Sequence, residues 1–310
     1  MSFINVINLN NSPDSPKDEG LNVFFDLGSW MGFSLSDEET NTGFSGPYIL
    51  GLEHGIWSSN NFTSIDLISE NGNSLLTNLN YSEQKYCPGK LENQLHFEDI
   101  EIISNLIFTS DKSAIISSKI INNGNQNLKF SPQWKGEIFD EIGNLINNDT
   151  ILITFLDKNQ KIYLTPISNE DFTINSDTIK YSISFNNFIL KPNKSKTYSI
   201  EIQYHPDQKN IKKNTNRINV TQTIEDNHLR WEKYLEITNE KSLSKKEKLI
   251  LTKSICTLIN NWRSAAGALK HDGLFPSYHY KWFQGFWSWD SWKHAVALVK
   301  IDVELAKNQV

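Results

Sequence analysis

The stretches DTIKYSISF (residues 177–185) and KTYSIEIQY (residues 196–204) decide the fold class of this chain. In each of them every second residue is apolar, and the residues between are mostly polar. Because successive side chains of a strand point to opposite faces, this alternation is typical of a half-buried β-strand. The two apolar faces consist of Ile179, Tyr181, Ile183, Phe185 and of Tyr198, Ile200, Ile202, Tyr204.

Similar runs precede these two stretches. They are LHFEDIEII at 95–103, AIISSKII at 114–121 and ILITFL at 151–156, and the turn-forming segments NNGNQN, DEIGN and KPNKS punctuate the series. A chain of 310 residues suggests about two domains. We therefore expect an antiparallel β-sandwich over about residues 20–205, within a first domain at 1–205.

A change of character follows His205. The segment HPDQKNIKKNTNR is charged, rich in Asn and poor in large apolar residues, so we assign residues 206–244 to a linker that includes a helix. Its basic cluster has no interleaved aromatic residues, and a solvated connector is favoured over a nucleic-acid patch. The cluster consists of Lys209, Lys212, Lys213 and Arg217.

Helical periodicity marks the last third of the chain, with helices expected near 223–238, 245–264 and 290–307. Ser244 and Glu247 have the spacing of a capping box for the second of these. Residues 295–299 are apolar on nearly every side, which is typical of a helix surrounded by protein. We therefore expect residues 245–310 to be the beginning of a larger, incomplete helical domain.

Composition excludes several classes of protein. The net charge of −6 and the pI of about 5.7 give no general attraction to nucleic acid or to an anionic membrane. No segment has a basic leader pattern or a membrane-spanning length, so we expect a cytoplasmic protein. Two distant cysteines, Cys87 and Cys256, are too few for a disulfide framework or a thiolate metal site. No cofactor and no metal are expected, and no oligomeric state is indicated.

Aromatic residues are concentrated around QGFWSWDSWKHAVAL at 284–298, since eight of the fifteen residues from Tyr278 to Trp292 are aromatic. Aromatic faces match the C–H faces of a pyranose, and a carboxylate such as Asp290 can accept paired hydrogen bonds from sugar hydroxyls. The alternative is that the tryptophans fill the interior between two domains and that Asp290 caps the last helix. The residues alone leave both interpretations open.

Two motifs carry a family resemblance. GFWSWDSWKHAVAL at 285–298 resembles the start of the catalytic domain in glycoside hydrolase family 63 and its bacterial relatives, including mannosylglycerate hydrolase-like enzymes, and is similar to the WDSYW element of trehalases. NVFFDLGSWMGFSL at 22–35, followed by GFSGPYIL at 43–50, resembles the opening of the β-sandwich domain of these enzymes. The resemblance implies a β-sandwich, a helical linker and an (α/α)6 toroid, truncated here after its first helices.

The resemblance also implies a sugar subsite. Asp290 is then expected to bind sugar hydroxyls near the attacking water, with oligosaccharides or small α-glucosides as substrates. The substrate-binding residues that it implies are Trp287, Ser288, Trp289, Asp290, Phe283 and Phe286, and the flanking candidates are Tyr278, Trp282, Lys293 and His294. For His294 a hydrogen-bonded core role, and for Lys293 a surface role, are the alternatives.

The family hydrolyses with inversion, which needs a general acid and a general base about 6.5–9.5 Å apart. In relatives both lie downstream of this motif, so we expect them beyond residue 310, with no catalytic residue in this chain, which by itself should be inactive. Asp272 lies in an Asp-Gly turn, Glu247 in the predicted cap and Asp302 within the predicted last helix. A carbohydrate-binding or interaction module and a phosphorolytic toroid enzyme remain alternative functions.

Overall fold

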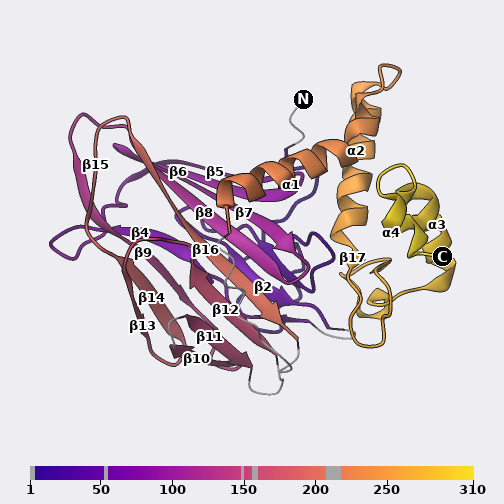
Figure 1. Ribbon diagram of the computed structural model, residues 1–310, viewed down its shortest axis with the longest axis horizontal. Coiled ribbons are helices and arrows are strands. Elements are labelled where there is room, and N and C mark those ends of the chain that lie inside the picture. The colour runs from indigo at the N-terminus through magenta and orange to yellow at the C-terminus, as the bar shows by residue number, and fades with distance from the viewer. Residues whose placement is uncertain (1–3, 52–54, 148–149, 156–159, 207–217) are drawn as a thin grey trace.

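The computed structural model describes residues 4–51, 55–147, 150–155, 160–206 and 218–310. Strands dominate it up to residue 205, and helices follow (Figure 1). Most of the predicted linker segment after His205, including the basic cluster Lys209, Lys212, Lys213 and Arg217, lies outside the described residues.

The larger sheet has eight antiparallel strands in the order β10-β11-β12-β16-β8-β7-β6-β5. The predicted strand at 196–204 forms its centre, because β16 pairs with β8 over nine residues, from Ser195 opposite Ile121 to Gln203 opposite Ser113. The strands are β5 (Leu79–Cys87), β6 (Lys90–Phe97), β7 (Ile100–Ser110), β8 (Ser113–Asn122), β10 (Gly143–Asn147), β11 (Ile151–Phe155), β12 (Lys161–Pro166) and β16 (Ser195–His205).

A second sheet of five strands faces the first, and smaller sheets complete the β-structure. The five strands are β4 (Ser64–Ile68), β9 (Leu128–Glu137), β13 (Phe172–Ser176), β14 (Lys180–Phe185) and β15 (Phe188–Leu190). A three-stranded sheet consists of β1 (Met31–Ser34), β2 (Ser45–Ile49) and β3 (Ile56–Trp57), and a two-stranded sheet consists of β17 (Trp262–Arg263) and β18 (Gly273–Leu274).

The core lies between the two large sheets, where the alternating apolar residues meet. Trp134 on β9 is opposite Ile183 of β14 on one side and Ile65 of β4 on the other, and all three are buried. The inward residues of β16, such as Ile200, belong to the same apolar cluster. The predicted alternation is therefore confirmed in β14 and β16, and the fold is consistent with a β-sandwich N-terminal domain.

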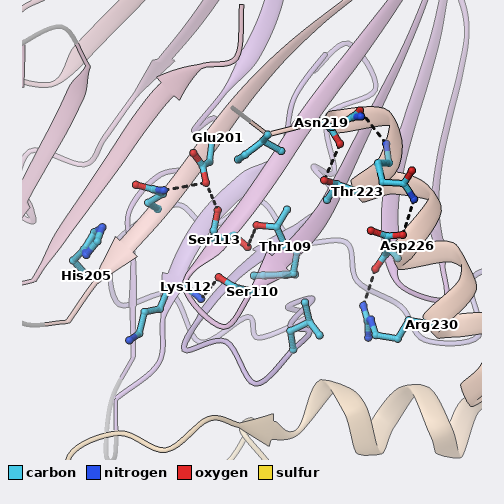
Figure 2. Close-up of a pocket in the computed structure, with 16 residues that line it drawn as sticks. Thr109, Ser110, Lys112, Ser113, Glu201, His205, Asn219, Thr223, Asp226 and Arg230 are labelled. Carbon is cyan, nitrogen blue, oxygen red and sulfur yellow. Dashed lines mark hydrogen bonds between the residues drawn. The ribbon is translucent and has the colours of Figure 1, made fainter. Parts of the chain in front are cut away.

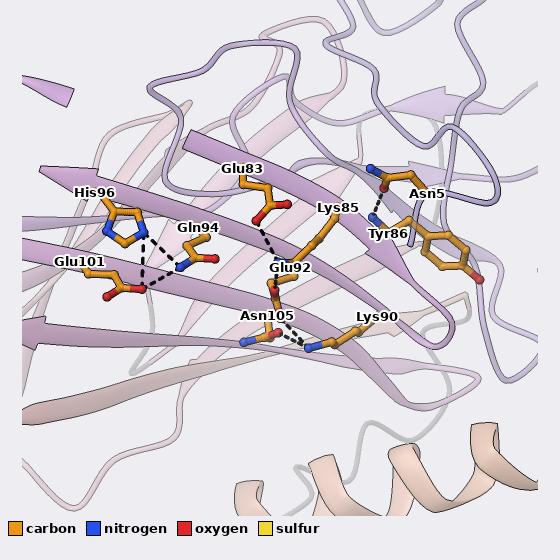
Figure 3. A network of polar contacts seen from close by, with 10 residues as sticks. All are labelled: Asn5, Glu83, Lys85, Tyr86, Lys90, Glu92, Gln94, His96, Glu101 and Asn105. Carbon is orange, nitrogen blue, oxygen red and sulfur yellow. Dashed lines mark hydrogen bonds and ion pairs between the residues drawn. The ribbon is translucent and has the colours of Figure 1, made fainter. Parts of the chain in front are cut away.

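The outer face of the eight-stranded sheet carries a network of charges near its β5 edge (Figure 3). Lys85 Nζ lies 3.1 Å from Glu83 Oε2 and 3.0 Å from Glu92 Oε1, and Lys90 Nζ lies 2.5 Å from Glu92 Oε2. Charged side chains on an edge strand disfavour pairing with a strand of another molecule. The network therefore explains how a long edge strand tolerates exposure.

The helices follow the sandwich. In Figure 1, α1 runs across the strands of the larger sheet, and α2, α3 and α4 lie together at one end. The elements are α1 (Val220–Tyr234), η1 (Glu236–Asn239), α2 (Lys245–Asn260), η2 (Lys281–Phe283), α3 (Ser288–Leu298) and α4 (Val303–Lys307). The capping box of Ser244 and Glu247 is confirmed at the start of α2. Asn219 caps α1, which starts earlier than predicted.

The prediction of a single helix at 290–307 is wrong. The segment contains two helices, α3 and α4, because the Asp302 carboxylate accepts a hydrogen bond from Leu305 N (3.0 Å) and so caps a second helix. Val296 on α3 and Val299 at its C-cap are exposed, so the described part of the chain does not surround this helix.

A buried carboxylate joins α1 to the β-structure. Asp26, fully buried, accepts hydrogen bonds from Arg230 Nη1 (2.9 Å), Arg230 Nη2 (2.6 Å) and Trp231 Nε1 (2.9 Å). Gly89, in the β5–β6 turn, packs on the same tryptophan with a positive φ of 86°, and a Cβ there would lie 2.1 Å from the Trp231 ring. These contacts fix α1 against the sheet.

Candidate functional site

The predicted aromatic motif forms an exposed cluster on η2, the following loop and the first two turns of α3. Trp282 is 73% exposed, Trp289 is 65% exposed and Trp292 is 57% exposed, although buried tryptophans are the norm in this chain's β-structure. Phe283, Phe286 and Trp287 are also exposed, to a smaller degree. We use the term aromatic cluster for Trp282, Phe283, Phe286, Trp287, Trp289 and Trp292.

Within the aromatic cluster two indole rings are stacked. The centroids of Trp287 and Trp289 are 5.9 Å apart and their planes differ by 21°. The Phe283 ring lies 6.0 Å from that of Trp287 in a tilted arrangement. Phe286 lies against Gly273, where a Cβ would come within 2.6 Å of its ring, so that a larger residue at position 273 would displace it. Within the cluster, Phe283, Trp287 and Trp289 therefore form a connected row of aromatic rings.

Asp290 lies in the first turn of α3, beside these rings. The N-cap position is occupied by Trp287, and no side chain caps the helix, so the alternative in which Asp290 is the cap is wrong. The carboxylate is half-buried, and within the described ranges no hydrogen-bond donor is paired with it. A carboxylate in the first turn is favoured by the helix dipole, and this one keeps its lone pairs available for a ligand.

The neighbours of Asp290 differ in their exposure. Ser288 is exposed, and its carbonyl oxygen accepts a hydrogen bond from Ser291 Oγ (2.8 Å). His294, one turn further along α3, is half-buried; burial lowers its pKa below 6.5, against the opposing charge of Asp290. Its Nδ1 is buried without a hydrogen-bond partner in the part of the chain described, so the expected hydrogen-bonded core role is not observed. Lys293 is exposed, with Nζ 5.5 Å from the centre of the Trp292 ring.

Tyr278 lies apart from the aromatic cluster, although sequence reasoning placed it among the flanking candidates. Its side chain is buried, and its hydroxyl donates to Val23 O (2.9 Å) and accepts from Asn260 Nδ2 (2.8 Å). Burial raises the pKa of this hydroxyl well above its usual value of 10.0. A ligand at the exposed cluster does not reach this hydroxyl, because Tyr278 is buried beneath the loop that carries the cluster.

Sequence reasoning missed the residues that join the two recognised motifs. Asn260 Oδ1 accepts from Phe25 N (2.6 Å), Ser264 N donates to Gly28 O (2.7 Å), and Trp30 Nε1 donates to Ser264 O (3.1 Å). The motif at 22–35 therefore packs directly under the segment that leads to the aromatic cluster. The one available signal was a carboxylate, Asp26, inside an apolar run.

The three other carboxylates considered have structural partners. Asp272 Oδ2 accepts from Trp262 Nε1 (3.0 Å) and Oδ1 accepts from Ala265 N (3.1 Å). Glu247 completes the capping box of α2, and Asp302 caps α4. Each of the three carboxylates therefore has a structural partner, and that none of them is a catalyst stays a prediction.

Two grooves lie elsewhere, beside α1. One of about 710 Å³ is bounded by α1 and by β7, β8 and β16, and on its wall buried Glu201 accepts from Ser113 Oγ (2.7 Å) and Gln203 Nε2 (3.0 Å) (Figure 2). The other, of about 750 Å³, lies between α1 and β6–β8. Their aromatic residues, Phe108 and Trp231, are buried and offer no face to a sugar. No residue of the predicted sugar subsite lines either groove.

The described residues contain no group of three or more His, Cys, Asp or Glu side chains placed to hold a metal ion. No helix among them is long and apolar enough to span a membrane.

Comparison with solved structures shows what the fold is similar to. The chain matches a protein described as "Putative kojibiose phosphorylase from human microbiome" with 13% identity and a TM-score of 0.58, over 99% of this chain and 49% of that one. This chain thus spans about half the length of that protein. It also matches a galactose mutarotase-like protein from Lactobacillus casei (8% identity, TM-score 0.38, 59% of this chain and 99% of that one).

A third match is heparan sulfate lyase HepC from Pedobacter heparinus, with 10% identity and a TM-score of 0.34 over 47% of this chain and 24% of that one. The amino-acid sequence gives a more definite result, because residues 8–252 match a single family. That match covers most of the chain, including the strands β1 to β16, α1 and the start of α2. The chain therefore belongs to the family described as Glucosidase YgjK, N-terminal.

Proposed function

We propose that this chain is the N-terminal part of an inverting glycoside hydrolase, related to family 63, that acts on α-linked glucosides or related small saccharides. The observation that carries the proposal is the stacked pair Trp287–Trp289 beside an unpaired Asp290 carboxylate. Membership of a glucosidase family supports the class of substrate. Residues 1–205 then form its β-domain, 206–244 the linker and 245–310 the first part of an (α/α)6 toroid.

In this proposal the aromatic cluster is a wall of the sugar subsite. The faces of Trp287 and Trp289 pack against the C–H groups of the sugar ring. Asp290 accepts hydrogen bonds from two adjacent hydroxyls, and because it is charged these bonds are stronger than bonds between neutral groups. By holding the sugar, Asp290 also fixes the position of the carbon that water attacks.

Inversion needs two further carboxyl groups, one to protonate the leaving oxygen and one to activate water, about 6.5–9.5 Å apart. Asp272, Glu247 and Asp302 each have structural partners, so neither role is assigned to them. The proposal places the general acid and the general base outside residues 1–310.

The test is Asp290→Asn in the enzyme that contains this chain. Asn keeps the size of the side chain, but it replaces one acceptor oxygen by a donor and removes the charge. We expect kcat/KM on an α-glucoside to fall about a hundredfold, because a lost charged hydrogen bond costs about 1.5–3 kcal/mol and the water is misplaced as well. Stability should change by less than about 1 kcal/mol, the contribution of one charge to a helix dipole.

Glu304→Gln is the matched control, since Glu304 is also an acidic residue in the first turn of a helix, α4, but lies outside the aromatic cluster. It should leave kcat/KM unchanged. Normal turnover in Asp290→Asn at unchanged melting temperature would reduce Asp290 to a residue that only stabilises α3.

Phosphorolysis is the second candidate, because the structural match with a TM-score of 0.58 is to a protein described as a phosphorylase. The two reactions differ in their product, which is free sugar in one case and sugar phosphate in the other. Hydrolysis is favoured because the charged group beside the stacked rings is a carboxylate, which repels phosphate. A pure binding module would instead hold saccharide through residues 1–205 alone.

A further inference from the structure

The aromatic cluster rests on a buried hydrogen-bond network. Asn260, at the end of α2, holds the N-terminal motif with both ends of its amide: Oδ1 accepts from Phe25 N (2.6 Å) and Nδ2 donates to Val23 O (2.9 Å). The same Nδ2 lies 2.8 Å from the Tyr278 hydroxyl, which donates to Val23 O (2.9 Å). Tyr278 is therefore fixed at its far end by two partners from two different parts of the fold.

Gln284 connects this network to the cluster. It is buried although Phe283, Phe286 and Trp287 around it are exposed, and its Nε2 donates to Tyr278 O (2.9 Å). The side chain therefore folds back under the loop while its neighbours point outward. The hydrogen bond from Gln284 to Tyr278 O thus ties the loop to the backbone of Tyr278.

Arg263 packs against the aromatic residues of this network. Its guanidinium is fully buried, 4.0 Å from the centre of the Phe25 ring, 5.7 Å from that of Tyr278 and 5.9 Å from that of Phe275. Nη1 donates to Asn260 O (3.0 Å), while Nε and Nη2 have no hydrogen-bond partner among the described residues. Contact with three aromatic rings compensates part of the cost of burying this charge.

We infer that Tyr278 and Gln284 are positioning residues, which hold the stacked Trp287–Trp289 pair in the geometry that binds sugar. The inference deepens the proposed function and rests on it. Neither residue touches the sugar; each acts through the loop between residues 278 and 287. Tyr278 thereby has a different role from the direct sugar contact implied by the family resemblance.

The stacked pair supplies a readout that does not need a substrate. Two indoles 5.9 Å apart couple their electronic transitions, which gives a circular dichroism couplet in the far ultraviolet. Trp289→Phe removes the pair and defines the signal that belongs to it. Tyr278→Phe deletes only the hydroxyl, and Gln284→Met deletes the donor while keeping a side chain of similar length.

Tyr181→Phe is the matched control. Tyr181 is also buried, and its hydroxyl likewise has two partners, Thr63 Oγ1 (2.8 Å) and Phe62 O (2.8 Å), but it lies between the sheets, far from the cluster in the fold. We expect Tyr278→Phe and Gln284→Met to lose the couplet to the level of Trp289→Phe, and Tyr181→Phe to keep it. A merely structural role predicts the same spectrum for both tyrosine variants.

A retained couplet in Tyr278→Phe and Gln284→Met would overturn the inference, as would a couplet that Trp289→Phe leaves unchanged. If Tyr278→Phe does not fold, Gln284→Met decides. In the enzyme containing this chain, the same two variants should raise KM for an α-glucoside by about tenfold. An unchanged KM with a lost couplet would contradict the sugar subsite and leave the positioning of the pair intact, so the two failures can be told apart.

Discussion

The β-structure and the aromatic cluster use tryptophan in opposite ways. Trp57 and Trp134 are fully buried between strands, whereas Trp282, Trp289 and Trp292 are mostly exposed. Burying a tryptophan stabilises a fold by several kcal/mol, and leaving it in water forfeits that contribution. The difference indicates that the buried tryptophans of the β-structure stabilise the fold, whereas the exposed tryptophans of the cluster are available to a ligand or another surface.

The sharpest test of this contrast replaces one tryptophan in each region by alanine. Trp134→Ala should destabilise the protein by about 3–5 kcal/mol, because it opens a cavity between β9 and its neighbours. Trp289→Ala should change stability by less than about 0.5 kcal/mol, as for other surface substitutions. Urea denaturation measures both, and a similar loss in the two variants would abolish the distinction between the regions.

The buried carboxylate Asp26, which joins α1 to the β-structure, should have the next largest effect. Asp26→Asn removes the charge that Arg230 and Trp231 contact, and leaving the partly buried Arg230 guanidinium without its carboxylate should cost about 1.5–3 kcal/mol. Asp226→Asn, on the exposed side of α1, is the control and should change stability by about 0.5 kcal/mol at most. Thermal melting of both variants measures the difference; equal melting temperatures would mean that the pair does not hold α1.

A smaller effect, dependent on pH, belongs to the β-structure alone. Burial opposes the charge of Asp66, but hydrogen bonds from Lys135 (2.7 Å) and Ser74 (2.5 Å) outweigh burial and hold its pKa below 3.8. A lowered pKa contributes stability above the unfolded value and loses it as pH falls through the folded one.

Asp66→Asn should therefore cost about 1 kcal/mol at neutral pH, a value reduced because Lys135 is half-exposed. The difference from the unmodified protein should disappear as pH falls below 3.8. Denaturation midpoints across this pH range measure it, and a difference that persists in acid would assign the effect to packing.

The smallest effect is expected on the exposed side of α3. Val296 is exposed despite its apolar side chain, so Val296→Gln should change the stability of this chain by no more than about 0.5 kcal/mol. Val→Gln at a buried helix position would cost several times more. A large loss by chemical denaturation would show that this face packs on part of the protein in solution.

Local patterns account for what could be predicted. Alternation identified β14 and β16, and the Ser244–Glu247 spacing identified the start of α2, because both signals lie within a few residues. The break between α3 and α4 was missed because Asp302, which caps α4, stands between Ile301 and Val303 in a stretch whose apolar residues continue the helical period. A capping residue is visible in sequence only where the pattern also changes.

The site was predicted in part for the same reason. The density of aromatic residues located the cluster, but the burial of Tyr278 goes with contacts to Val23 and Asn260 that no local pattern contains, and Gln284 bonds in turn to Tyr278 O. Likewise, the pairing of Asp26 with Arg230 joins residues 204 positions apart. A single sequence does not show which distant residues meet.

The bonds between the end of α2 and the N-terminal motif also set an order of events during synthesis. Asn260, the partner of Phe25, is synthesised 235 residues later, and Tyr278, the partner of Val23, is synthesised 255 residues later. At ribosomal rates of about 5–20 residues per second, that delay is roughly 12–50 s. Throughout it Val23 and Phe25 lack these final partners, whereas Phe24 between them packs on Tyr86 and Phe108, which are made much earlier. A growing chain of this protein therefore has to cover Val23 and Phe25 by chaperones or by provisional burial in its own unfinished sheet.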